Sequence, residues 1–179
     1  MSKILLTFLA DYLFAILVIV AAGIILRTGH RRGEIIVRGL LASISALIID
    51  KSSGLVFYHD RPFVVLHKDP LALNPHNNAF PSDHALLVFA AAFVVWVATK
   101  NWKYGVALLL GGVVVGWARV EALVHWPIDI VGSFVIAGVM VALWFTIPLP
   151  QAAARFYGTL DRFITTRLPA TLTGQKKRK

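Results

Sequence analysis

The sequence contains no cysteine and only nine acidic residues, against 18 lysines and arginines. Without cysteine there can be no disulfide framework, no thiolate metal site and no cysteine nucleophile. The formal net charge of +9 would be compatible with a protein that binds nucleic acid. However, the basic residues lie between apolar runs and at the C-terminus, where membrane insertion explains them. Because nothing resembles a nucleic-acid module, we expect membrane lipids, and not nucleic acid, as partners.

Apolar residues dominate the rest of the composition. They make up 58% of the 179 residues, the mean hydropathy is +0.72, and several apolar runs could cross a hydrocarbon core of about 30 Å. This composition predicts an all-α, polytopic membrane protein that folds as one compact helix bundle. We expect about five transmembrane helices, over residues 4–26, 35–57, 84–99, 104–118 and 127–147. The first run is longer than the apolar core of a signal peptide, which favours a retained span.

A different pattern follows Pro148. Apolar residues recur at helical spacing from Ala152 to Leu168 with arginines between them, which predicts an amphipathic helix on a membrane surface. The final Lys176 to Lys179 would favour anionic lipid; a solvated helix with a disordered basic tail is the alternative. The sequence thus divides into a transmembrane domain, residues 1–150, and a cytoplasmic helix with a basic tail, residues 151–179.

The basic residues also predict the orientation of the spans. The positive-inside rule assigns Arg27 to Arg32, Lys100 to Lys103 and the basic C-terminus to the cytoplasm. About five spans then leave the N-terminus outside and bring two polar connections, residues 58–83 and 119–127, to the outer face. Both connections contain histidine, aspartate and arginine, or lead directly to them, so we expect the functional site on this face.

The first connection enters an apolar run through Phe80-Pro81-Ser82-Asp83-His84. Proline is favoured in the first turn of a helix and serine or aspartate at its cap, so a helix should begin here and continue to about Ala98. The start of a helix presents unpaired N–H groups and about half a positive charge, which favours a phosphate or similar anion. His84 would stand beside that anion; an ordinary capped membrane helix with a surface histidine is the alternative.

The second connection holds a histidine and a carboxylate close together. If Pro127 opens a helix, Asp129 lies in its first turn and can reach back to His125. Such a carboxylate would fix the tautomer of the imidazole and stabilise the cation formed during reaction. A capping carboxylate beside an interfacial histidine is the alternative.

Two histidines on one face suggest two roles in phosphoryl transfer. His125 could be a nucleophile that forms a covalent phosphoryl intermediate, and His84 could protonate the leaving oxygen. This reaction needs mainly positioning and the neutralisation of negative charge, which Arg61, Ser82 and Arg119 could supply without a metal.

These residues resemble the membrane branch of the type-2 phosphatidic-acid phosphatase superfamily. The superfamily has three signatures. The first is a lysine followed, after six residues, by Arg-Pro, and the second is Pro-Ser-Gly-His. The third is Ser-Arg, then His after five residues and Asp after three more. In this chain they correspond to Arg61-Pro62, to Pro81 through His84, and to Ala118-Arg119 followed by His125 and Asp129. Together with Asp-Arg-Pro-Phe, the Pro-Ser-Asp-His version is similar to the bacterial undecaprenyl-diphosphatase subgroup associated with bacitracin resistance.

The resemblance implies a metal-independent lipid phosphatase that uses no cofactor. For the subgroup, the reaction is hydrolysis of undecaprenyl diphosphate to undecaprenyl phosphate on the outer face of the plasma membrane, which recycles the carrier lipid for cell-wall peptidoglycan synthesis. Carried over residue by residue, the resemblance implies His125 as nucleophile, Asp129 as its partner, His84 as general acid, and Arg61, Ser82 and Arg119 as phosphate ligands.

The chain departs from the signatures at three positions. Gly54 stands where the first signature has its lysine, and Lys51, one helical turn earlier, is the candidate substitute as a phosphate ligand. Ala118 replaces a serine. Asp83 replaces the glycine inside the phosphate site and adds negative charge there, so we expect it to point away, to pair with a cation or to take part in proton transfer.

Other functions are compatible with the same residues. Phosphatidylglycerol phosphate or phosphatidic acid could be the lipid, since apolar spans reveal little about lipid shape. A small transporter or proton relay could use the intramembrane groups Asp11, Asp50, His84 and Asp129. A metal hydrolase could hold its ion with His84, His125, Asp83 and Asp129.

Three further polar residues have open roles. Asp11 could be functional or could bond to a neighbouring helix. Glu121 could pair with Arg119, and His59 could contact a second phosphate.

Overall fold

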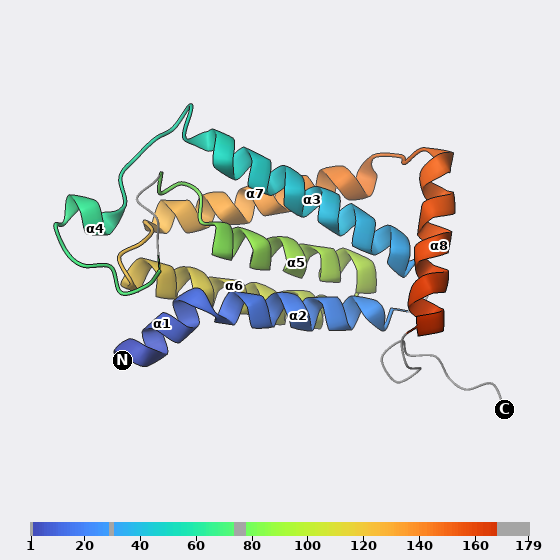
Figure 1. Ribbon diagram of the computed structural model, residues 1–179, viewed down its shortest axis with the longest axis horizontal. Helices are drawn as coiled ribbons and strands as arrows, with labels where there is room; N and C mark the ends of the chain where they lie inside the picture. The colour runs from blue at the N-terminus through green and yellow to red at the C-terminus, as the bar shows by residue number, and fades with distance from the viewer. Residues whose placement is uncertain (1, 29–30, 74–77, 168–179) are drawn as a thin grey trace.

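The computed structural model describes residues 2–28, 31–73 and 78–167. Within these ranges every regular element is a helix, which confirms the all-α prediction (Figure 1). The helices are α1 (Lys3–Asp11), α2 (Leu13–Leu26), α3 (Arg32–Ser53), α4 (Pro62–Val65), α5 (Asp83–Thr99), α6 (Trp102–Glu121), α7 (Pro127–Thr146) and α8 (Gln151–Arg167).

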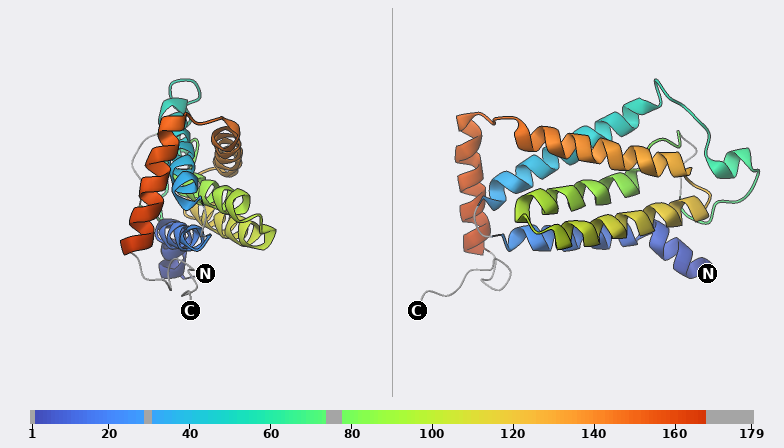
Figure 2. Two further views of the ribbon diagram at one scale, coloured as in Figure 1. Left: turned by 90° about the vertical axis from the view of Figure 1, so that its right-hand side faces the viewer. Right: turned by 180° about the vertical axis from the view of Figure 1, so that it is seen from behind.

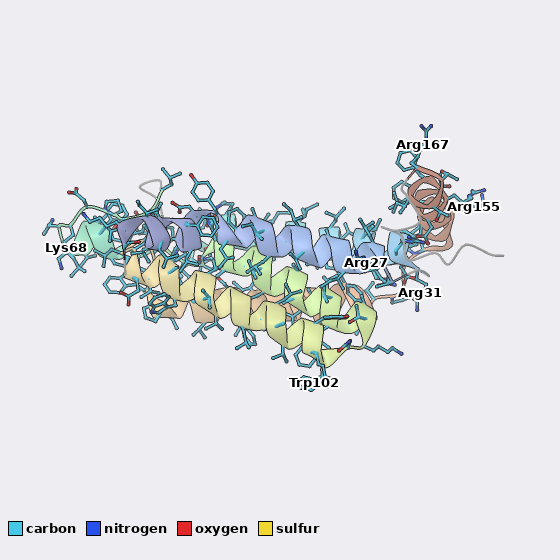
Figure 3. The ribbon with its side chains drawn as sticks, turned by 90° about the horizontal axis from the view of Figure 1, so that it is seen from below. Arg27, Arg31, Lys68, Trp102, Arg155 and Arg167 are labelled. Atoms are coloured by element: carbon cyan, nitrogen blue, oxygen red, sulfur yellow. The ribbon has the colours of Figure 1, made fainter. Side chains whose placement is uncertain are left out.

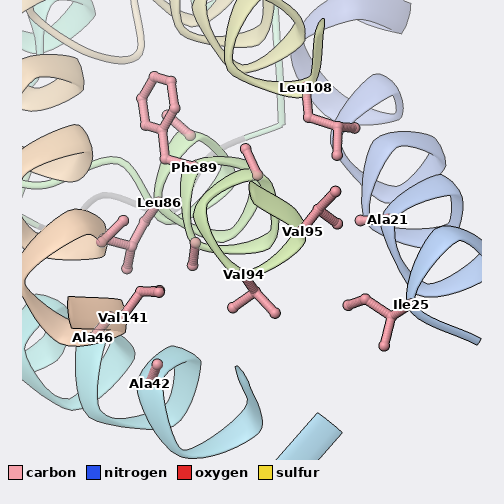
Figure 4. Close-up of a cluster of buried hydrophobic side chains, with 14 residues drawn as sticks. Ala21, Ile25, Ala42, Ala46, Leu86, Phe89, Val94, Val95, Leu108 and Val141 are labelled. Carbon is pink, nitrogen blue, oxygen red and sulfur yellow. The ribbon is translucent and has the colours of Figure 1, made fainter. Parts of the chain in front are cut away.

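The apolar helix α5 lies at the centre of the bundle. It packs against α6, α7, α2 and α3, and its side chains point toward all of these neighbours. In Figure 4, Val95 lies near Ala21 of α2, and Leu86 lies near Val141 of α7. A helix that is apolar on every side is expected in the middle of such a bundle.

The outer surface of the bundle is apolar, as a membrane protein requires. Helices α6 and α7 are each long and apolar enough to cross a bilayer, and α1 with α2 would form a third, bent span. Helix α5 is rich in apolar residues and has 17 residues, so it is about 26 Å long at a rise of 1.5 Å per residue. Exposed side chains such as Ile44 and Ile48 of α3, and Val135 and Val139 of α7, give the bundle surfaces suited to lipid. The chain is therefore a membrane protein built from several apolar helices.

Two of the differences from the predicted spans have local causes. The run over residues 4–26 forms two helices that are bent by 43°, because the backbone leaves helical geometry at Tyr12, with φ −120° and ψ −30°. Helix α3 ends at Ser53, before the predicted Phe57. The Ser53 hydroxyl lies 2.6 Å from the carbonyl oxygen of Asp50 and 2.7 Å from that of Phe80, so it ties the end of α3 to the loop that precedes α5.

Polar segments collect at the two ends of the bundle. One end holds the N-terminus, α4 and the connection between α6 and α7 (Figures 1 and 2). At the other end, α8 lies across the bundle. Figure 3 shows Lys68 at the first end, and Arg27, Arg31, Arg155 and Arg167 at the second.

Helix α8 docks on the start of α3. The Gly33 N–H donates to Asp161 Oδ1 at 2.9 Å, and Arg32 Nε lies 3.7 Å from the same oxygen. A β-carbon at Gly33 would stand 2.6 Å from the carbonyl oxygen of Tyr157, so glycine permits this close approach. The helix predicted after Pro148 is confirmed, whereas its contact with a membrane stays a prediction. Leu168 and the basic tail lie outside the described residues.

Candidate functional site

Five of the sequence-predicted residues are almost fully buried at the end of the bundle that carries α4 (Figure 1). They come from the loop before α4, the N-cap of α5, the last turn of α6, the connection that follows it and the first turn of α7. These residues are Arg61, Ser82, Arg119, His125 and Asp129. Buried polar side chains are usually paired or used in function, so this cluster is the candidate site.

His125 lies at the centre of the cluster and is 0% exposed. Its Nδ1 lies 2.8 Å from the carbonyl oxygen of Ala79 and 3.4 Å from Asp129 Oδ2. Its Nε2 lies 3.1 Å from Nη1 of Arg61. Because a carbonyl only accepts and a guanidinium only donates, Nδ1 carries the proton and Nε2 presents its lone pair. This is the tautomer that a nucleophilic Nε2 requires.

Helix-start geometry holds Asp129 in place. Helix α7 begins at Pro127, as predicted, and the Asp129 carboxylate accepts the Trp126 N–H at 2.7 Å from Oδ2. This hydrogen bond turns the carboxylate back toward His125, so the predicted contact is confirmed. On its other side, Oδ1 lies 3.0 Å from Nε2 of His59, a contact that no sequence pattern indicated.

The two buried arginines of the site have different partners. Arg61 donates from Nη1 to the carbonyl oxygen of Val124 at 2.7 Å. Arg119 Nη1 lies 2.7 Å from Asp11 Oδ1, so the intramembrane acid bonds to a neighbouring helix and takes the place expected for Glu121. Arg119 Nε is buried and makes no hydrogen bond within the described part of the chain. That N–H is therefore a donor that an anion could use.

The charges around Arg61 and His125 act on each other. Burial lowers the pKa of His125 to about 4; Arg61 and Arg119 act in the same direction, and the contact with Asp129 opposes them. His125 is therefore neutral at pH 7. Burial and Arg119 also lower the pKa of Arg61, whereas the carboxylates of Asp83 and Asp129 raise it. Arg119 and Asp83 are therefore close enough to affect the charges of Arg61 or His125.

The start of α5 faces this cluster. Ser82 is the N-cap, and Pro81 precedes it, outside the first turn where the pattern had predicted proline. The Ser82 N–H donates to Ser133 Oγ at 2.9 Å. By contrast, Ser82 Oγ is buried without a hydrogen-bond partner among residues 2–28, 31–73 and 78–167. The hydroxyl and the N-terminus of α5 therefore offer donors for an anion.

A second, more exposed group of charges lies at the same helix start. Lys51 Nζ lies 3.2 Å from Asp83 Oδ2 and 2.7 Å from Asp50 Oδ2. Asp83 Oδ1 lies 3.7 Å from His84 Nδ1, and the His84 ring packs against Phe14 with centroids 4.3 Å apart. Asp83 thus pairs with a cation, which was one of the expected arrangements. Lys51 reaches the site although it stands one turn before the signature position.

Direct contacts join six of the sequence-predicted site residues into two groups, while Ser82 and Arg119 belong to the same buried cluster. Arg61, His125 and Asp129 touch directly in the first, and Lys51, Asp83 and His84 form the second. In the described ranges, no three or more His, Asp or Glu side chains are grouped as metal ligands would be. His59, Asp11 and Ser133 are site neighbours that lie outside the sequence signatures. Asp11, as an acid within an apolar run, and His59, two residues before Arg61, had a signal in the sequence, whereas Ser133 had none.

Comparison with known proteins finds several relatives. Putative undecaprenyl-diphosphatase YbjG of Escherichia coli (strain K12) is 33% identical over 109 residues, which cover 60% of this chain and 53% of that protein. Undecaprenyl-diphosphatase BcrC of Bacillus subtilis (strain 168) is 28% identical over 132 residues, or 71% and 67% of the two chains. Bacitracin transport permease protein BcrC of Bacillus licheniformis is 30% identical over 142 residues, or 76% and 66%. The chain thus spans from 53% to 67% of the length of these relatives.

A family profile described as the PAP2 superfamily matches residues 35–152. This range runs from the first turn of α3 to the start of α8 and includes both contact groups of the site. It leaves out α1 and α2, and with them Asp11. Because the match covers most of the chain and contains the buried His125 pair with its arginine, the chain belongs to the PAP2 superfamily.

Proposed function

We propose that this protein is a metal-independent lipid phosphatase that hydrolyses undecaprenyl diphosphate to undecaprenyl phosphate. The observation that carries the proposal is the state of His125: buried, neutral, protonated on Nδ1, and facing Arg61 with the lone pair of Nε2. The names of the Escherichia coli and Bacillus subtilis relatives support the choice of lipid. The proposed role is recycling of the carrier lipid for cell-wall synthesis, and hence bacitracin resistance.

The proposed reaction has two steps. His125 Nε2 attacks the terminal phosphorus, a P–N bond forms, and the P–O bond to undecaprenyl phosphate breaks while His84 donates its proton to the leaving oxygen. Water then attacks the phosphohistidine, with His84 taking a proton from it, and inorganic phosphate leaves. Asp129 holds the Nδ1 side of the imidazole and stabilises its positive charge in both steps.

The phosphate ligands in this proposal are donors whose positions suit an anion. Arg61 and Arg119 neutralise charge on the phosphoryl oxygens. Ser82 adds a hydroxyl at the N-terminus of α5 that has no hydrogen-bond partner among the described residues. Lys51 and Asp83 lie at the exposed edge of the site, where Lys51 offsets the Asp83 carboxylate and can contact a second phosphate.

An apolar cavity supports a substrate with a long hydrocarbon tail. It has a volume of about 270 Å³ and lies between α2, α3 and α5, with Val18, Ala21, Ile25, Gly39, Ser43 and Val94 among its lining residues. Figure 4 shows Ala21, Ile25, Ala42 and Val94 in this region. A polyprenyl tail could lie there while the diphosphate stays at the polar end.

The proposal includes the orientation in the membrane. The positive-inside rule puts the end with Arg27, Arg31 and α8 in the cytoplasm, so the site faces outward from the plasma membrane. Residues 1–150 then form the multi-pass catalytic domain, and residues 151–179 form the cytoplasmic part.

The test is release of phosphate by the purified protein in detergent with excess chelator. The substrates are undecaprenyl diphosphate, phosphatidylglycerol phosphate and phosphatidic acid, and the variants are His125→Ala and His84→Ala. We expect chelator-resistant release, fastest from undecaprenyl diphosphate, and near-complete loss in both variants. Loss of wild-type activity on chelation would favour a metal hydrolase. No release from any lipid by folded protein, with substrate flux across sealed vesicles, would favour a transporter.

A further inference from the structure

Asp129 lies between two histidines, and only one of them belongs to the family signatures. Its Oδ2 faces His125, at 3.4 Å from Nδ1. Its Oδ1 faces His59, at 3.0 Å from Nε2. Both His59 Nε2 and Asp129 Oδ1 are buried, and neither atom has a hydrogen-bond partner in the described ranges, so their contact with each other is an ion-pair distance and not an aligned hydrogen bond. His59 Nε2 and Asp129 Oδ1 are therefore close polar neighbours inside the protein.

The backbone around His59 is tied to the segment that holds His125. The His59 N–H donates to Asn78 Oδ1 at 3.1 Å, and the His59 carbonyl oxygen accepts the Ala79 N–H at 3.1 Å. The carbonyl oxygen of Ala79 is in turn the acceptor for His125 Nδ1. The ring of Phe57 packs edge-on against His59 with centroids 5.2 Å apart. These contacts hold the imidazole on the outer side of Asp129.

The facing atoms define what His59 can do. A carboxylate oxygen only accepts, so the His59 nitrogen that lies 3.0 Å from it can serve it only as a protonated N–H, which a small ring rotation would align as a donor. Asp129 Oδ2 is already shared by the Trp126 N–H and His125. A donor on Oδ1 would keep the carboxylate from rotating about its side-chain torsion, and would thereby keep Oδ2 against His125.

We propose that His59 is a positioning residue, which holds the Asp129 carboxylate so that His125 keeps the orientation for attack. This inference rests on the proposed function. It also gives His59 a role different from contact with a second phosphate, because His59 Nε2 is directed at Asp129. In this proposal His59 acts through Asp129 and not by contact with the substrate or with the reacting nitrogen.

Two substitutions separate the donor from the bulk of the side chain. His59→Gln keeps an N–H at about the reach of Nε2, and His59→Leu removes the donor while keeping similar volume. Both keep the backbone hydrogen bonds to Asn78 and Ala79, because the side chain takes no part in them. His67→Gln, at an exposed histidine of the same connection, is the matched control.

The experiment measures kcat and KM for phosphate release from undecaprenyl diphosphate. We expect His59→Leu to lower kcat about tenfold, as for the loss of one hydrogen bond to a charged group, with KM within twofold of wild type. His59→Gln should restore most of kcat, and His67→Gln should match wild type. A His59→Leu enzyme with wild-type kcat, or with a raised KM and unchanged kcat, would overturn the proposal; the second result would indicate phosphate contact.

A measurement that needs no activity tests the contact itself. In a double-mutant cycle of thermal stability, His59→Leu and Asp129→Asn should be coupled, because each removes the same contact. Additive effects would contradict the inference. Coupling in a protein that releases no phosphate from any lipid would instead show that the contact is real and the proposed function wrong.

Discussion

The guanidinium of Arg61 faces the lone pair on Nε2 of His125. Its Nη1 lies 3.1 Å from Nε2 and also donates to the carbonyl oxygen of Val124 at 2.7 Å. In the free protein, the group proposed to bind phosphate therefore covers the proposed nucleophile. A phosphoryl group that draws the guanidinium toward its oxygens would uncover Nε2 as it arrives, so substrate binding and exposure of the nucleophile are coupled.

Replacement of Arg61 by lysine should impair catalysis more than folding. Lysine keeps the charge but lacks the planar fork that can contact two oxygens and orient Nε2. We expect kcat/KM for undecaprenyl diphosphate to fall by about 10² to 10³, the range found when one preorganised donor is removed from a transition state.

The matched control for this substitution is Arg155→Lys, at the other end of the molecule (Figure 3). It should leave kcat/KM within twofold of wild type. Near-wild-type turnover by the Arg61→Lys variant would show that the contact with His125 is incidental to the reaction.

The pair between Asp11 and Arg119 should matter for stability and for anion binding together. Both side chains are buried, so Asp11→Asn leaves the Arg119 charge uncompensated, which typically costs about 3–5 kcal/mol. We expect a lower apparent Tm and weaker inhibition by vanadate, because Arg119 loses the partner that orients it. Asp69→Asn, at an exposed acid, is the control. Equal Tm and vanadate inhibition in the two variants would contradict this role of Asp11.

The low pKa of His125 predicts how stability depends on pH. The pKa is about 4 in the folded protein against an ordinary value of 6.5 for histidine, so the unfolded chain takes up a proton between these values and the folded protein does not. Stability is therefore complete above about pH 6.5 and falls as the pH is lowered toward 4. Between pH 7 and pH 5, apparent Tm should fall more in wild type than in His125→Gln. A larger fall in apparent Tm for His125→Gln than for wild type would contradict this prediction.

The pair between Lys51 and Asp83 should affect substrate affinity with little effect on stability. Lys51 is 63% exposed, and exposed ion pairs contribute about 0–1 kcal/mol. Lys51→Met removes the cation that lies 3.2 Å from the Asp83 carboxylate, where the diphosphate is proposed to bind. We expect KM to rise about fivefold to tenfold, consistent with about 1 kcal/mol between two charges about 4 Å apart in water.

The double variant Lys51→Met/Asp83→Asn removes both charges. If Lys51 acts mainly by offsetting Asp83, KM should return to within about twofold of wild type, and the two effects should not add. A double variant as poor as Lys51→Met alone would show instead that Lys51 contacts the substrate directly.

Sequence reasoning predicted the features that have local causes. Pro127 and Asp129 both lie in the first turn of α7, and that geometry alone is enough to bring Asp129 back to His125. The apolar runs similarly predicted the main helices, because uninterrupted hydrophobic sequence is a local signal of a span. The bend at Tyr12 has no comparable signal, since the apolar pattern continues on both sides of it.

The contacts that sequence reasoning missed join distant parts of the chain. The sequence indicated Glu121 as a possible partner of Arg119, but residues two apart on a helix do not face each other. The partner in the structure is Asp11, which reaches Arg119 from another helix. The contact between His59 and Asp129 similarly depends on how the loop before α4 lies against α7. Periodicity within one helix carries no information about such register between elements.

The most direct test of the central claim is to trap the phosphoryl group on His125. Undecaprenyl diphosphate labelled in its terminal phosphate would be mixed with the protein and quenched with alkali within milliseconds, and the labelled peptide identified by mass. The account predicts an acid-labile, alkali-stable phosphoryl group on His125 in wild type, and none in His125→Ala. A phosphoryl group on any other residue, or full turnover by His125→Ala, would contradict it.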